Sequence, residues 1–86
     1  MNQDEEKRWA NARRVKEQAE TRLLKLSGVT GVDVGYKETE GRTTDIVAIR
    51  VFVAKKGTVP AEQTIPTHIQ DVPTDVIERR FVLNRT

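Results

Sequence analysis

Residues 31–56 read GVDVGYKETEGRTTDIVAIRVFVAKK, a pattern that predicts two long β-strands joined by a polar turn. In the first half, Val32, Val34 and Tyr36 alternate with polar or small residues. This is the period of two that places successive side chains on opposite faces of a strand. Between the two strands, Gly41 can adopt the positive φ that tight hairpin turns require. The segment therefore predicts an antiparallel hairpin.

The second strand of this hairpin is almost continuously apolar. Residues 46–53, IVAIRVFV, contain a single charged residue, Arg50. Such a run is typical of a strand that is covered on both faces or lies at the centre of a sheet. A charge in this position needs a sheet edge, a solvent-exposed face or a carboxylate partner, and we expect Arg50 to have one of the three.

A helix is predicted before the hairpin, over about residues 3–27. Its buried face is indicated by an apolar stripe with steps of three and four residues. The stripe consists of Trp9, Ala12, Lys16, Ala19, Leu23 and Leu26, with Val15 beside Lys16. Acidic residues 4–6 suit the N-terminal turn of a helix, and Gly28 suits the left-handed position that follows its last turn.

The N-terminal part of the helix carries Trp9. A helix of about 25 residues spans about 38 Å, whereas an eight-residue strand spans about 27 Å. We therefore expect the first turns of the helix to extend past the sheet. Three interpretations of Trp9 stay open at this point: it lies on a frayed end, it docks on a partner or a second copy, or it packs on its own sheet.

A third strand is predicted at about residues 74–83, after a connection over residues 61–70 that has room for one helical turn. Its direction and its neighbour stay open, because the connection is long enough to cross over the sheet. The predicted fold is a single α+β domain, 1–86, with one long helix packed on a three-stranded, at least partly antiparallel sheet in the order α-β-β-β. The expected bounds are about 3–27 for the helix and about 30–38, 44–55 and 74–83 for the strands.

Composition narrows the class of protein. The 86 residues include no cysteine, so neither a disulfide nor a thiolate metal site can form. No segment approaches the roughly 20 apolar residues of a membrane span, and the charged N-terminus lacks the apolar core of a secretory signal. We therefore expect a cytoplasmic protein without membrane contact. The formal net charge of +2, from 15 basic and 13 acidic residues, does not by itself indicate nucleic-acid binding.

Side chains that perform catalysis are scarce. The chain has one serine, Ser27, and one histidine, His68. A triad of these two with Asp71 or Asp75 can be drawn, but Ser27 falls at the expected helix end, and no glycine-rich loop offers an oxyanion hole. One histidine with two aspartates is likewise a small ligand set for a metal. We predict no enzymatic activity and no cofactor.

Several segments, taken in order, resemble a small module of bacterial proteins. They are GVTGVDVGYK at 28–37, FVAKK at 52–56, IPTHI at 65–69 and VPTDVIE at 72–78. In that family the module is non-catalytic and lies just upstream of trypsin-like serine peptidase domains; the similarity covers roughly residues 20–80. Its matching positions are Gly31, Gly35, Tyr36, Lys37, Phe52, Lys55, Lys56, Pro73, Thr74, Asp75 and Glu78.

The resemblance implies a fold and a docking surface. It does not imply peptidase activity, because no triad-bearing barrel is present in these 86 residues. We expect either a free-standing copy of the module or a part of a longer protein.

The functional prediction is a non-enzymatic interaction module that binds a protein partner, or a second copy of itself, through a sheet edge, a sheet face or the Trp9 end of the helix. The candidate interaction surface consists of Trp9, Arg13, Tyr36, Lys55, Lys56 and Asp75. Asp75 also has a structural interpretation, in which it accepts backbone hydrogen bonds.

Weak nucleic-acid binding through the helix arginines, Lys55 and Lys56 is the alternative function. The helical region 2–27 interleaves seven basic with five acidic residues, a pattern more typical of a solvated helix face than of a phosphate-binding stripe. No small-molecule ligand is indicated.

Overall fold

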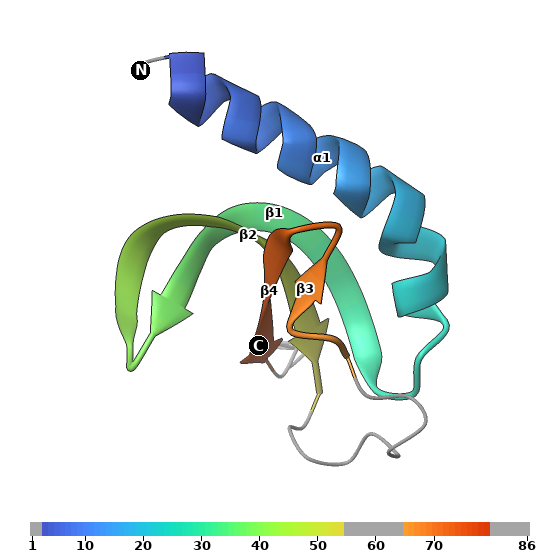
Figure 1. Ribbon diagram of the computed structural model, residues 1–86. Helices are drawn as coiled ribbons and strands as arrows, with labels where there is room; N and C mark the ends of the chain where they lie inside the picture. Colours follow the sequence, from blue (N-terminus) through green and yellow to red (C-terminus); the bar gives the residue numbers. More distant parts are fainter. Residues whose placement is uncertain (1–2, 55–64, 80–86) are drawn as a thin grey trace, which may run out of the picture.

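The computed structural model describes residues 3–54 and 65–79, and it shows one helix packed on a mixed four-stranded sheet. The elements are α1 (Gln3–Leu24), β1 (Val29–Thr39), β2 (Arg42–Val53), β3 (His68–Ile69) and β4 (Val72–Glu78). The strand order is β1-β2-β4-β3 (Figure 1). β1 pairs antiparallel with β2, β4 pairs parallel with β2, and β3 pairs antiparallel with β4.

The predicted α+β class is confirmed, and so is the central position of the apolar strand, since β2 lies between β1 and β4. The number of strands differs from the prediction. The described part of the connection, residues 65–70, contains the short strand β3 and no helical turn, and β3 forms a hairpin with β4. Gln70 and Asp71 form its two-residue turn, both with positive φ, as tight hairpin turns require. The predicted continuation of the last strand beyond residue 79 lies outside the described residues.

The helix ends three residues earlier than predicted. After Leu24, the N–H groups of Lys25 and Leu26 bond to carbonyls three residues back, at 3.3 and 3.1 Å, which tightens the last turn. Gly28 follows with φ of 83°, the left-handed conformation that terminates helices, as predicted. β1 then runs back beneath α1 (Figure 1).

The β1–β2 hairpin closes with a two-residue turn at Glu40 and Gly41, whose φ values are 52° and 78°. Thr39 and Arg42 are the last paired residues on either side. Two successive positive φ angles match the right-handed twist of the flanking strands, so the turn joins them without splaying the hairpin. The expectation that Gly41 adopts positive φ is confirmed.

An irregularity bends this hairpin. Between two regular parts of the ladder, Lys37 of β1 lies opposite three residues of β2, 44–46, and the Thr44 hydroxyl donates to the Lys37 carbonyl at 2.7 Å. Extra residues in one strand increase local twist and curvature. The two strands arch together, with α1 on the convex side (Figure 1). The bent tip is anchored by Asp75 of β4, whose Oδ2 accepts the Glu38 N–H at 2.8 Å. Asp75 thus accepts a backbone hydrogen bond, as expected, but it does so from within β4 and from the distant Glu38 rather than at the start of its own strand.

The core lies between α1 and the convex face of the sheet. Four small or branched side chains of the helix are buried, namely Ala12, Val15, Ala19 and Leu23. They pack on alternate residues of β2 and on the β3–β4 hairpin: Val47, Ile49, Val51, Val53, Ile69 and Val72. Val15, rather than Lys16, therefore occupies the centre of the buried stripe, because Lys16 lies at its margin and pairs with Glu20 at 2.9 Å.

The opposite face of the sheet accommodates Arg50. Its guanidinium donates to both carboxylate oxygens of Asp33 on β1, at 2.7 Å each. This bidentate geometry is the strongest form of an arginine–carboxylate pair, and a carboxylate partner is one of the three environments expected for Arg50. Arg50 and Arg79 also lie near the ring of Phe52, at 5.6 and 5.0 Å from its centroid, so the arginines cover an aromatic ring that would otherwise face solvent.

Replacing Leu23 by alanine is expected to lower the free energy of unfolding by about 2–5 kcal/mol, because it leaves a cavity beneath the helix. Leu24 is the matched control: it is 44% exposed, and Leu24→Ala should cost no more than about 0.5 kcal/mol. Urea titration followed by circular dichroism measures both. Equal losses for the two variants would contradict the orientation of α1.

Asp75→Ala is expected to cost about 1–3 kcal/mol of stability, because it leaves the Glu38 N–H without its acceptor. Asp75→Asn retains a side-chain oxygen and should lose markedly less. Amide hydrogen exchange at Glu38 supplies the local measurement, with faster exchange expected in the alanine variant than in the asparagine variant. Identical exchange in both variants would show that Asp75 does not hold the hairpin tip.

Candidate interaction surface

β1 is the outermost strand on one side of the sheet, and no strand of the described residues pairs with its outer edge. Its uninterrupted part is Gly31–Tyr36, six residues that pair in constant register with β2. The ladder changes register on either side of this stretch, between Val29 and Gly31 and between Tyr36 and Glu38. An edge strand presents unpaired backbone N–H and C=O groups in a row, ready to pair with another chain.

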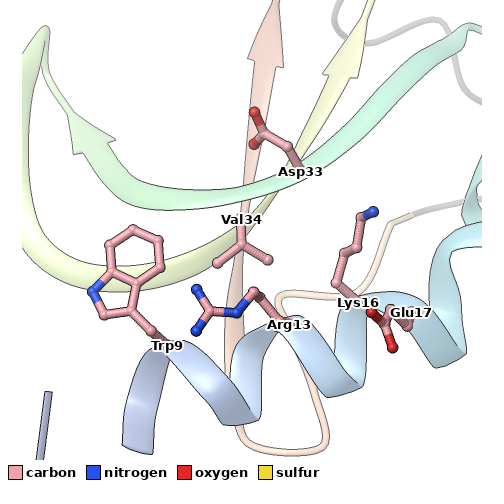
Figure 2. Close-up of a pocket in the computed structure, with 6 residues that line it drawn as sticks. All are labelled: Trp9, Arg13, Lys16, Glu17, Asp33 and Val34. Atoms are coloured by element: carbon pink, nitrogen blue, oxygen red, sulfur yellow. The ribbon is translucent and has the colours of Figure 1, made fainter. Parts of the chain in front are cut away.

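A groove of about 240 Å³ runs beside this edge, between α1 and β1. Its lining consists of Trp9, Arg13, Lys16, Glu17, Asp33 and Val34 (Figure 2). Figure 2 shows Val34 pointing from β1 toward the helix, whereas Asp33 points away from it. The groove therefore combines an apolar floor with charged walls and opens along the edge of the sheet.

A second hollow, of about 460 Å³, adjoins the first on the surface of the helix. It is lined by Glu6, Trp9, Ala10 and Arg13, so that Trp9 and Arg13 belong to both. Trp9 and Arg13 therefore lie between the two hollows on the surface of α1.

Two charges in the groove are available to a partner. Lys16 pairs with Glu20 along the helix, and Asp33 is occupied by Arg50. Arg13 and Glu17, in contrast, are exposed and form no ion pair within the described part of the chain, although they lie four residues apart on one helix. Figure 2 shows that their charged ends point in different directions, with the Arg13 guanidinium turned toward Trp9.

Trp9 packs on its own sheet. Its ring meets Tyr36 edge to face, with centroids 5.1 Å apart and an interplanar angle of 81°, and the indole contacts the hydrophobic core. The Tyr36 hydroxyl donates to Oε1 of Glu5 in the first turns of the helix. The sheet therefore reaches beneath the start of α1, and the expected overhang is wrong, because the 11-residue β1 is longer than assumed.

These contacts shift two pKa values in opposite directions. Accepting the hydrogen bond from Tyr36 lowers the pKa of Glu5, since the bond favours the carboxylate. The same bond raises the pKa of Tyr36, since it is lost when the phenol ionises. The buried Nε1 of Trp9 is near enough to act on both groups, yet it makes no hydrogen bond of normal geometry.

The predicted surface residues divide into three groups. Trp9, Arg13 and Tyr36 lie together on the side of α1 and β1 described above. Asp75 lies on β4 beneath the hairpin tip, where it lines a separate hollow with carboxylates of the tip. Lys55 and Lys56 lie outside the described residues.

Sequence reasoning missed Val34 and Glu17 as parts of this surface. Val34 looked like an ordinary core residue of a period-two strand, and Glu17 like one of many solvated helix charges. The available signal was the spacing of Arg13 and Glu17, which places both on the helix flank that begins at Trp9.

The residues considered for chemistry do not converge. His68 is exposed on β3, with its Nδ1 3.2 Å from the hydroxyl of its neighbour Thr67. Within residues 3–54 and 65–79, no three His, Asp or Glu side chains are arranged to hold a metal ion. Over the same residues, α1 is not apolar enough to form a membrane span.

Comparisons of the chain with models of protein families, with curated proteins and with solved structures find no match. The resemblance to the module upstream of serine peptidases therefore stays a prediction.

Tyr36→Phe is expected to change how stability depends on pH. A lowered pKa of Glu5 means that its bond to Tyr36 stabilises the fold above the usual pKa of about 4.3 and is lost as the pH falls through the lower folded value. A raised pKa of Tyr36 means that stability is lost as the pH rises from about 10 through the higher folded value. The natural chain should therefore have a higher free energy of unfolding than Tyr36→Phe. This difference should be constant near neutral pH and should decrease at both low and high pH.

Urea titrations from pH 3 to 11 measure this difference, and a carbon-13 NMR titration of Glu5 reports its pKa in each protein. An unchanged Glu5 pKa in the phenylalanine variant would rule out the bond as the cause.

Proposed function

We propose that this chain is a non-enzymatic interaction module that binds a protein by strand addition at the open edge of β1. The observation that carries the proposal is the position of Gly31–Tyr36: a regular stretch at the border of the sheet, flanked by a groove with an apolar floor. In strand addition, backbone hydrogen bonds provide affinity, and pockets for alternate side chains provide specificity.

The length of the open stretch defines the kind of ligand. Six residues of strand extend about 20 Å, which matches a short extended segment of a partner chain. Every second side chain of that segment would point toward α1 and enter the groove between Trp9 and Glu17. Apolar side chains suit Val34 and Trp9 at the floor, while charged ones suit Arg13 and Glu17 on the walls.

Protein is favoured over nucleic acid by the signs of these charges. Glu17 places a carboxylate in the groove beside Arg13, and a carboxylate repels a phosphate backbone. Two further cations of the helix are engaged within the chain: Lys16 pairs with Glu20, and Arg14 donates to the Asn11 side chain. Nucleic-acid binding therefore gains no support from this surface.

Site-specific photocrosslinking in the producing cells tests the proposal. A benzophenone amino acid at Ala10, which lines the hollow beside Trp9 and Arg13, should form covalent adducts with protein. The control places the same group at exposed Arg22, outside both hollows and nearer the other end of α1, where no adduct is expected. Mass spectrometry identifies the adducts. A folded protein that gives no adduct from Ala10, or the same adducts from both positions, would contradict the proposal.

A further inference from the structure

We infer that the partner is a second copy of this chain, joined through antiparallel pairing of β1 with β1 about a two-fold axis at Val34. The inference rests on the proposed use of the β1 edge, and it adds the identity and register of the occupant. Three features of the described residues support it: the symmetry of the open stretch, its side-chain pairs and the charges on the helix.

Symmetry restricts the register. When two identical sheets join edge to edge with both helices on the same face, the two-fold axis is perpendicular to the sheet. Each side chain then lies on the same face of the sheet in both copies. Residues that face each other across the contact must therefore be an even number of positions apart, so the residue on the axis lies opposite the same residue of the second copy. Within Gly31–Tyr36, the two positions nearest the centre are Asp33 and Val34. Each gives a paired stretch of similar length, so the length of the contact does not decide between them.

The side chains decide in favour of Val34. An axis at Asp33 would place Asp33 directly opposite Asp33 of the second copy, and like charges in that position are destabilising. An axis at Val34 places valine opposite valine and Asp33 opposite Gly35 of the second copy. It also places Val32 opposite Tyr36 of the second copy on the helix face, a β-branched and aromatic pair of the kind that stabilises sheets.

The same axis makes the helix charges complementary. Arg13 and Glu17 line the same groove as Val34, so the axis passes close to the turn of α1 that carries them. The two helices run antiparallel across a two-fold axis. Arg13 then faces Glu17 of the second copy, and Glu17 faces Arg13 of the second copy. Both side chains lack an ion-pair partner within the described residues of one chain, and the dimer supplies one to each.

The groove also has the dimensions of a helix interface. α1 contacts β1 more extensively than it contacts β2 or β4, so it lies toward the open border of the sheet (Figure 1). Because α1 contacts β2 as well as β1, its axis lies inward of β1. When two β1 strands lie about 4.8 Å apart, two helices each placed about 2 Å inward of them are about 8–10 Å apart, which is packing distance. The second copy of α1 would thus close the groove that a single chain leaves open.

Charge reversal tests both the occupant and the register. Arg13→Glu gives a chain that is acidic at both positions 13 and 17, and Glu17→Arg gives a chain that is basic at both positions. In each homodimer, like charges would meet twice, so the dissociation constant should rise at least about tenfold over that of the natural chain. An equimolar mixture restores both opposite-charge pairs and should form a heterodimer, and the double variant Arg13→Glu/Glu17→Arg should dimerise like the natural chain.

Sedimentation velocity at several concentrations, with circular dichroism to establish folding, measures each protein and the mixture. Arg22→Glu is the matched control on the same helix, and its dimerisation should be unchanged. The inference is overturned if the natural chain stays monomeric at millimolar concentration, if either single reversal dimerises like the natural chain, or if the mixture fails to associate.

The crosslinking experiment separates this inference from the proposed function. Adducts of twice the chain mass from Ala10 support the dimer. Adducts with another protein only, together with a monomeric natural chain, overturn the dimer and leave strand addition to a different partner in place. A lack of any adduct overturns both.

Discussion

The parallel pairing of β4 with β2 is the constraint on which the rest of this structure depends. It places β2 between two strands, so that its backbone is paired on both sides and its apolar side chains are covered by α1. It also places Asp75 beside the bent hairpin, where it anchors Glu38. Because β4 occupies one side of β2 and β1 the other, β1 is left at the border with its outer edge open. The candidate surface is therefore a direct result of the sheet order.

Much of the fold could be predicted from the sequence because it follows from local patterns. Alternation of apolar and polar residues predicted β1, and a run of apolar residues predicted β2. Apolar residues spaced three and four positions apart predicted α1. Gly28 and Gly41 marked the helix end and the hairpin turn, where both adopt positive φ. The parallel direction of β4 and the short strand β3 could not be predicted in this way. Both depend on pairing between distant segments, and two residues of strand leave no periodic signal.

The candidate site was predictable in part for the same reason. Trp9 and Arg13 stood out by residue type and helical position, and both line the groove. The groove itself depends on how α1 crosses β1, which periodicity does not specify. Without that crossing, Glu17 was one charge among many and Val34 one valine among several. Asp75 was assigned to the surface, whereas the bend of the hairpin makes it a buried acceptor, only 8% exposed.

The strands at the two borders of the sheet differ greatly in length, and this difference limits which kinds of oligomer can form through strand pairing. β1 offers a long edge, while the strand on the opposite border, β3, has only two residues. A head-to-tail contact between unlike edges would repeat without end and produce a filament. Pairing of β1 with β1 would use the same edge of both chains, so neither copy keeps that edge open for a third chain. Assembly through β1 would therefore be closed at two subunits, and the sheet would avoid the open-ended growth that exposed strand edges invite.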